Sequence, residues 1–322
     1  NSTTIPPVGV KVFDGGGKSS ISEVNLVEWQ EPIVDGQYNI GHICTAQQCR
    51  VGNADKVAFR WFPTVDERID YTFQELEEQS NKFANALSSL GFSVGDILFT
   101  FLPKCPEQFF AFLGALKQEV IIAPLFANFG DEALYDRLSD AGAKGIVTKK
   151  SLLKKILRIR GKLPSLEHII VIDGDGHQSD GIYSYNELVR HCRDSFTALP
   201  TTSCTPSVLH YTSGSTGKPK GVLHLHGSVE HQSRTAREVL SLTANDVFWC
   251  TADQGWVTGT SYGIIAPWSL GITQVHYGGS YDAAAWFRLL ETNAVTVWYT
   301  SPTALRMLLC GAVCCFAMTL LS

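Results

Sequence analysis

Hydrophobic residues follow two alternating periods from about residue 57 onward. Short apolar runs rich in β-branched and aromatic residues predict strands, and longer stretches with apolar residues three or four positions apart predict helices. The predicted strands occupy residues 56–62, 96–102, 120–125, 145–148, 168–173, 207–212, 246–252, 272–277 and 295–300. The predicted helices occupy residues 73–90, 106–117, 131–141, 227–242, 260–270 and 282–293.

Three helix starts carry clear boundary signals. Thr72 and Glu75 have the spacing of a capping box, so we expect a helix that begins there and ends at Gly91. Pro106 stands in a first helical turn, where its missing N–H has no cost. Ser301 followed by Pro302 predicts one more helix, with a favourable N-cap and proline at the next position.

Strands that alternate with helices of ten or more residues indicate parallel βαβ units, and therefore an α/β fold with helices on both sheet faces. The turn-rich stretch 191–207 interrupts the alternation, and we expect it to link two such sheets. We predict an irregular N-terminal extension over residues 1–50, a first α/β subdomain over 51–200, a second over 201–309, and an apolar tail over 310–322.

Composition narrows the class of protein. Of 322 residues, 44% are hydrophobic and 18% are charged, which is typical of a globular chain. The net charge of −5 argues against a nucleic-acid binder. The nine cysteines form no Cys-x-x-Cys pair and no zinc-site spacing, which favours reduced thiols.

No signal peptide opens the chain, and the apolar tail is shorter than the ~20 residues that span a bilayer. We therefore expect a cytoplasmic protein without a membrane partner.

The strongest chemical signal is the segment YTSGSTGKPKG, Tyr211–Gly221, directly after a predicted strand. Its glycines Gly214, Gly217 and Gly221 allow tight backbone turns in which amide N–H groups converge on an anion. The neutral donors and cations of the predicted phosphate site are Thr212, Ser213, Ser215, Thr216, Lys218 and Lys220. Ligands collect at the carboxyl ends of parallel strands, so the segment lies where a polyphosphate site is expected.

The segment is not a Walker A loop. That motif has four residues between its glycines and a Ser or Thr directly after Lys, whereas here two residues separate Gly214 from Gly217 and Pro219 follows Lys218. A polar turn without a ligand is the alternative interpretation, and the ordered run of Ser, Thr, Gly and Lys disfavours it.

The segment resembles the phosphate-binding signature of the AMP-forming adenylate enzymes, a superfamily that includes acyl-CoA synthetases. The resemblance extends from about residue 24 to residue 308. FWCTADQGWVTGTSYGIIAPWSLG, Phe248–Gly271, and VWYTSPTALRML, Val297–Leu308, are similar to the acetyl-CoA synthetase branch. The resemblance implies two mostly parallel, doubly wound sheets from the large N-terminal domain, without the small C-terminal domain.

The resemblance also implies a reaction. A carboxylate attacks the α-phosphate of ATP, and the CoA thiol then attacks the acyl-adenylate, with ATP, Mg²⁺ and CoA as cofactor or substrates. Residues from Thr212 to Lys220 would hold the leaving phosphates. Trp256 would limit the acyl pocket to short acids, Val257 would touch the acyl methyl and Thr258 would face CoA. The alternative for Trp256 is an ordinary core aromatic, and for Asp253 a turn cap, which we favour.

The family carries further segments that we do not find after Leu308: a Glu that binds Mg²⁺, an Asp that binds the ribose, a Trp that selects acetate and a C-terminal catalytic Lys. No catalytic residue is therefore assigned, and we expect weak or no activity from these 322 residues alone. The leading hypothesis is an acetate–CoA ligase. A ligase for propionate or another short acid, and a non-catalytic nucleotide-binding remnant, are the alternatives.

Two other patterns have competing interpretations. His224 and His226 share one strand face and could bind a metal, but no third ligand is evident, so a structural role is favoured. The basic amphipathic stretch 149–162 could meet the 3′-phosphate of CoA or an acidic surface, or form a solvated helix face.

Overall fold

The computed structural model describes residues 11–13, 19–21, 36–175, 180–212 and 218–309. The chain divides into two compact units, Asn1–Glu31 and Pro32–Ser322. In the first unit, β1 (Lys11–Phe13) and β2 (Ser19–Ile21) pair antiparallel. The predicted tail at 310–322 lies outside the described residues.

The second unit contains two sheets, and both are mostly parallel. The seven-stranded sheet has the order β11-β10-β6-β5-β7-β8-β9, and only β11 runs antiparallel to its neighbour. Its strands are β5 (Ile97–Phe101), β6 (Ile121–Leu125), β7 (Gly145–Thr148), β8 (His168–Val171), β9 (Ile182–Ser184), β10 (Pro206–Thr212) and β11 (Lys220–Leu225). The predicted α/β class is confirmed.

The five-stranded sheet has the order β14-β12-β13-β3-β4, and only the β3–β4 hairpin is antiparallel. Its strands are β3 (Val57–Phe62), β4 (Ile69–Thr72), β12 (Val247–Cys250), β13 (Thr273–Tyr277) and β14 (Val297–Tyr299). β3 lies beside β13, with Val275 opposite Arg60.

The two sheets do not follow the order of the sequence. β3 and β4 precede the first sheet along the chain but pair within the second, and β10 and β11 follow the linker 191–207 but return to the first sheet. The subdomain boundary that we proposed near residue 200 therefore does not separate the sheets. Strand pairing over such distances leaves no mark in local periodicity, which reports only whether a segment is a strand.

The predicted helices form, and several shorter ones join them. The longer helices are α3 (Phe73–Ser89), α4 (Pro106–Lys117), α5 (Asp131–Asp140), α6 (Lys150–Arg160), α8 (Ser228–Glu238) and α11 (Ala283–Thr292). α7 (Tyr185–Arg190) is short, and the run α9 (Val257–Thr260), η2 (Ser261–Ile265) and α10 (Ala266–Ser269) is continuous. The Thr72–Glu75 capping box is confirmed, and Ser301 Oγ accepts a hydrogen bond from the Ala304 N–H at 3.1 Å.

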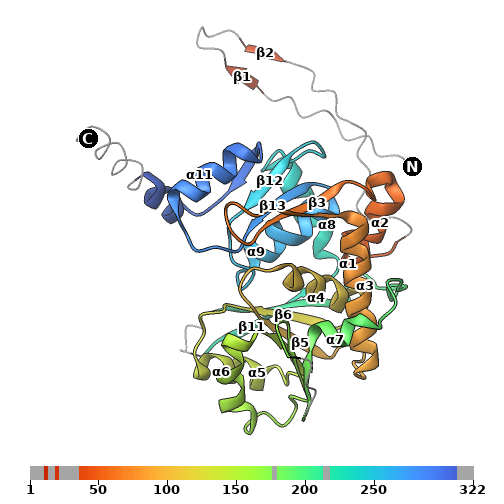
Figure 1. Ribbon diagram of the computed structural model, residues 1–322. Coiled ribbons are helices and arrows are strands. Elements are labelled where there is room, and N and C mark those ends of the chain that lie inside the picture. The colour runs from red at the N-terminus through yellow and green to blue at the C-terminus, as the bar shows by residue number, and fades with distance from the viewer. Residues whose placement is uncertain (1–10, 14–18, 22–35, 176–179, 213–217, 310–322) are drawn as a thin grey trace, which may run out of the picture. The chain divides into compact units, whose positions relative to one another are not determined.

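Helices cover both faces of the first sheet and fill the space between the two sheets (Figure 1). Along β5, Leu98 packs into the central cluster with α3 and α4, whereas Phe99 packs into the outer cluster with α5 and α6. In the central cluster, the Phe109 ring of α4 lies 5.3 Å from that of Trp268 and 4.4 Å from that of His276. α4 thus joins both sheets in one core.

The expected irregular extension over residues 1–50 is wrong for its last part. α1 (Ile40–Ile43), α2 (Ala46–Gln48) and the π-type turn η1 (Cys49–Asn53) belong to the second unit, and Ile40 and Ile43 are fully buried. The Asn39 side chain caps α1 and donates to the Leu116 carbonyl at 2.9 Å. Four-residue helices are too short to show a hydrophobic period, so the sequence gives little sign of them.

A buried ion pair joins α3 to the C-terminal end of α4. Lys117 is 1% exposed, and its Nζ donates to Glu77 Oε2 at 2.5 Å, Ser80 Oγ at 2.8 Å and Asn81 Oδ1 at 2.7 Å. All three ammonium protons have acceptors. Such a charge is tolerated in a core only when it is paired in this way.

We expect Glu77→Gln to lower the free energy of unfolding by about 3 kcal/mol, because it leaves the Lys117 charge buried without its counter-ion. The double variant Glu77→Gln/Lys117→Met should recover part of that loss, since it also removes the stranded charge. Denaturant unfolding measures both. Equal stability of wild type and Glu77→Gln would contradict a stabilising pair.

The same pair predicts a pH dependence. Burial alone would raise the pKa of Glu77, but Lys117 and hydrogen bonds lower it below the ordinary value of 4.5. A depressed carboxyl pKa contributes stability above 4.5 that is lost as pH falls through the folded-state pKa. The difference in unfolding free energy between wild type and Glu77→Gln should therefore shrink below pH 4.5.

Candidate functional site

A cavity of about 370 Å³ opens where strands of both sheets end. Its walls include the residues that follow β5, β6, β12 and β13 at their carboxyl ends. The lining residues are Pro103, Lys104, Phe126, Ala127, Asn128, Trp249, Thr251, Asp253, Tyr277, Gly278, Gly279 and Trp286. Carboxyl ends of parallel strands are where open α/β sheets bind ligands.

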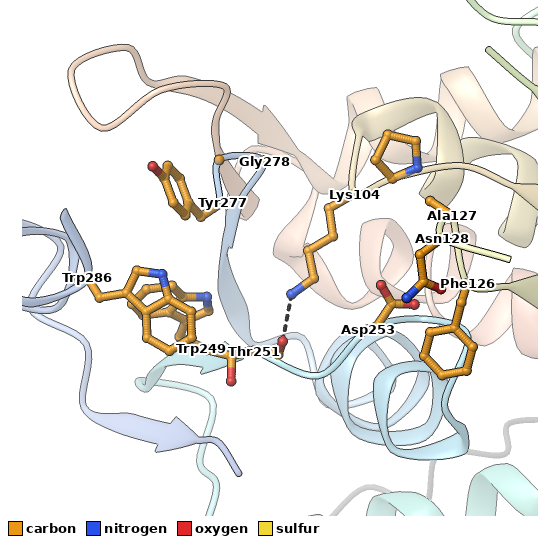
Figure 2. A pocket seen from close by; sticks show the side chains of 12 residues that line it. Lys104, Phe126, Ala127, Asn128, Trp249, Thr251, Asp253, Tyr277, Gly278 and Trp286 are labelled. Atoms are coloured by element: carbon orange, nitrogen blue, oxygen red, sulfur yellow. Dashed lines mark hydrogen bonds between the residues drawn. The ribbon is translucent and has the colours of Figure 1, made fainter. Parts of the chain in front are cut away.

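Aromatic rings and a few polar groups share the cavity wall. Figure 2 shows Trp249 and Trp286 close together on one side and Phe126 on the other, with Lys104 between them. The Lys104 Nζ donates to the Thr251 carbonyl at 2.9 Å. Burial lowers the pKa of Lys104, and the nearby Cys250 and Asp253 act in the opposite direction.

The predicted phosphate segment is the connection between β10 and β11. Thr212 ends β10 opposite Lys220 of β11, and Thr212, Lys218 and Lys220 are exposed. The expected members Ser213, Gly214, Ser215, Thr216 and Gly217 lie outside the described residues. Gly221 does not form a tight turn as expected, because it pairs with Tyr211 within the β-ladder.

This connection emerges at the same sheet edge as the cavity. β10 runs parallel to β6, with Val208 opposite Ile122, so the carboxyl ends of both strands lie on one side. Phe126, which follows β6, lines the cavity, and Thr212 ends the neighbouring strand. A ligand could therefore extend from the cavity toward the connection.

The predicted acyl segment begins α9 beside the cavity. The Trp256 ring lies edge-on to Phe126, 5.6 Å away, and Trp256 is 61% exposed rather than buried in a core. Val257 is also exposed, and Thr258 is partly exposed. None of these three residues lines the cavity itself. Asp253, a few positions earlier in the segment, does line it. Their roles toward acyl group and CoA stay predictions.

Asp253 has the turn-capping role that we favoured. Its Oδ1 accepts the Gly255 N–H at 2.8 Å, and burial raises the pKa of Asp253, while that hydrogen bond and Lys104 oppose the rise. His210 holds the other end of the segment, because its Nε2 lies 2.8 Å from Thr260 Oγ1. Burial lowers the pKa of His210 to about 4, so the ring is neutral at pH 7.

Of the two histidines weighed as metal ligands, His226 makes a structural contact. His226 is fully buried, and its Nδ1 accepts the N–H of Ile40, which fixes α1 to the strand end. Within the part of the chain that the structure describes, no group of three or more His, Cys, Asp or Glu could hold a metal ion. Within the same part, no helix is long and apolar enough to cross a membrane.

The basic stretch 149–162 forms α6, and much of its charge is already paired. Arg158 bonds both carboxylate oxygens of Asp131, and Lys150 pairs with Asp175. Lys155 donates to the Phe129 carbonyl at 2.7 Å. These contacts favour the solvated helix face over a site for an external anion.

Sequence reasoning missed most of the cavity wall, including Lys104, Phe126, Asn128, Tyr277 and Trp286. A signal was present, because several of these residues follow the last residue of a predicted strand. Lys104 and Asn128 are polar residues that lie three positions after the ends of β5 and β6, where site residues of parallel sheets are expected.

Glycines let the 253–260 segment fold closely on itself. A Cβ at Gly259 would lie 2.0 Å from the Asp253 carbonyl oxygen. We expect Gly259→Ala to lower the free energy of unfolding by about 1–3 kcal/mol, because backbone must shift to admit the methyl group. Gly263→Ala is the matched control in the same helical run, since its Cβ would meet only the Cys250 side chain, at ordinary contact distances of 3.6 Å from Sγ and 3.7 Å from Cβ. Urea denaturation should separate the two variants, and equal stabilities would contradict the close approach.

Comparisons with known proteins agree with this geometry. The model of the AMP-binding enzyme family matches residues 46–318. The acetyl-coenzyme A synthetase of Bacillus subtilis is 40% identical over 275 residues, which cover 85% of this chain and 48% of the relative. That of Mycobacterium bovis is 34% identical over 307 residues, which cover 89% of this chain and 47% of the relative.

Solved structures give the same picture. The crystal structure of Brucella canis acyl-CoA synthetase has a TM-score of 0.77 at 27% identity and covers 85% of this chain and 49% of its own. An anthranilate CoA ligase in complex with anthranoyl-AMP has a TM-score of 0.75 at 27% identity, over 86% of this chain and 52% of its own. The chain thus spans about half the length of these relatives. Since the family model covers well over half of the chain, the chain belongs to the AMP-binding enzyme family.

Proposed function

We propose that the protein is an ATP-dependent short-chain acyl-CoA synthetase that converts acetate, ATP and CoA into acetyl-CoA, AMP and pyrophosphate through an acyl-adenylate. The 322 residues would contribute the phosphate-binding connection and the acyl-binding segment. Support comes from the family match and from relatives named acetyl-coenzyme A synthetase at 34–40% identity.

One observation carries the proposal. The cavity and the last residue of β10, where the phosphate connection begins, both lie at the carboxyl ends of neighbouring parallel strands. A nucleotide with its polyphosphate at Thr212, Lys218 and Lys220 would have its other end near the aromatic wall of the cavity. Exposed ammonium groups and hydroxyls are suited to anionic oxygens, and aromatic rings to planar or apolar groups.

Mg²⁺ would arrive with ATP and neutralise charge on the phosphate oxygens. We assign no protein ligand to this ion among the described residues. Small-molecule substrates are the proposed partners.

The free thiols of Cys44, Cys49, Cys105, Cys192, Cys204 and Cys250 support a cytoplasmic location.

Two alternative functions predict different experimental results. A ligase for propionate would share every step and differ in the depth of its acyl pocket. A non-catalytic nucleotide-binding protein would bind ATP but never exchange pyrophosphate into it.

We expect the purified 322-residue protein to bind ATP and to form little or no acetyl-CoA. Lys218→Ala should weaken ATP binding about tenfold, because it removes one charge-assisted contact to phosphate. Lys154→Ala is the control, since it removes a lysine from α6 instead. Calorimetric titration with ATP measures the affinities, and equal loss in both variants would contradict the phosphate assignment.

A chimera in which the second half of the Bacillus subtilis relative follows this chain tests the reaction itself. It should support acetate-dependent exchange of labelled pyrophosphate into ATP, and a panel of acetate, propionate and butyrate identifies the acid. ATP binding by a folded chimera without any exchange would favour the non-catalytic alternative.

A further inference from the structure

Lys104 is a half-buried cation on the cavity wall with an incomplete set of protein acceptors. It comes from the loop after β5, in the first sheet, and its one hydrogen bond within the described residues goes to Thr251, after β12 in the second sheet (Figure 2). No salt bridge to Lys104 occurs within the described residues. An ammonium group has three protons to donate, so two have no protein acceptor there.

Lys117 shows how the same fold treats a buried lysine whose role is structural. Its three protons meet a carboxylate, a hydroxyl and an amide oxygen, all within 2.8 Å. Lys104 has only a neutral carbonyl. Lys117 is enclosed by α3 and α4, whereas Lys104 lines a cavity of about 370 Å³. The difference points to an acceptor that enters the cavity.

We infer that Lys104 binds an anionic oxygen of the substrate in this cavity, either the carboxylate of the acid or a phosphate oxygen of the nucleotide. The inference rests on the proposed function. Among the described residues that line the cavity, Lys104 is the only Lys or Arg, so it supplies the positive charge of that wall. A charge-assisted bond in such a partly enclosed site is stronger than one at the surface.

The neighbours of Lys104 fit this role. Asp253 also lines the cavity, and its Oδ1 accepts the Gly255 N–H. Burial lowers the pKa of Lys104, and the nearby Cys250 and Asp253 oppose that shift. Phe126, Trp249 and Trp286 supply apolar surface for the uncharged part of the ligand. Lys104 would thus fix the orientation of a ligand that the rings hold.

The experiment compares equilibrium binding of adenosine, AMP and acetate to the purified 322-residue protein. Lys104→Met removes the charge, and Lys104→Arg keeps it. Lys155→Met is the matched control, because Lys155 also donates to one backbone carbonyl but lies outside the cavity wall. Thermal unfolding without ligand reports any purely structural effect of each variant.

Lys104→Met should weaken binding of one anion about 10- to 100-fold, the range of one charged hydrogen bond, and leave adenosine binding unchanged. Loss with AMP assigns the phosphate oxygen, and loss with acetate assigns the carboxylate. Lys104→Arg should recover most of the affinity, and Lys155→Met should match wild type.

Unchanged affinity of Lys104→Met for both anions would overturn the inference, as would an equal loss for adenosine and AMP without a loss for acetate. Either result, together with a lower unfolding temperature of Lys104→Met, would mean that Lys104 only stabilises the contact between the two sheets. Failure of the wild type to bind adenosine and AMP would instead count against the proposed function. In that case the acetate titration alone tests the role of Lys104, and a wild type that does not bind acetate would overturn the inference.

Discussion

The packing of α4 between the two sheets is the contact on which the rest of the second unit depends. The Phe109 ring meets Trp268 and His276 from the side of the second sheet, and the same cluster includes Ile122 and Val208 from the first. Two sheets that share one core cannot shift independently without opening voids, because interiors are close-packed. Their relative placement is therefore fixed by side chains far from any polar chemistry.

That fixed placement has a chemical result at the strand ends. Residues after β5 and β6 face residues after β12 and β13 across one cavity, and the phosphate connection emerges from the strand next to β6. Lys104 and Thr251 meet there although they come from different sheets. The site is thus a property of the interface between sheets, and neither sheet supplies it alone.

Local chemistry in the sequence was enough to predict most of the longer elements but neither the short ones, such as α1 and β9, nor the pairing of the strands. The Thr72–Glu75 box, Pro106 and the apolar strands act over a few residues, and each was found where it was predicted. The sequence also located Thr212, Lys218 and Lys220 at a strand end. The pairing of β3 with β13, and the meeting of Lys104 with Thr251, join residues that no local pattern relates. The hydrogen bond from the Ile40 N–H to His226 Nδ1 likewise joins residues that no local pattern relates.

The crossing of strands between sheets has a consequence for synthesis on the ribosome. The β3–β4 hairpin, complete by residue 72, meets its parallel neighbour only when residues 273–277 have been made. Until then one edge of β3, whose residues are apolar except for Arg60, has no parallel neighbour. An unpaired apolar strand edge exposes a nascent chain to aggregation. The second sheet can therefore complete its pairing only after residue 277 has been made, when all seven strands of the first sheet, which end at Leu225, have already been synthesised.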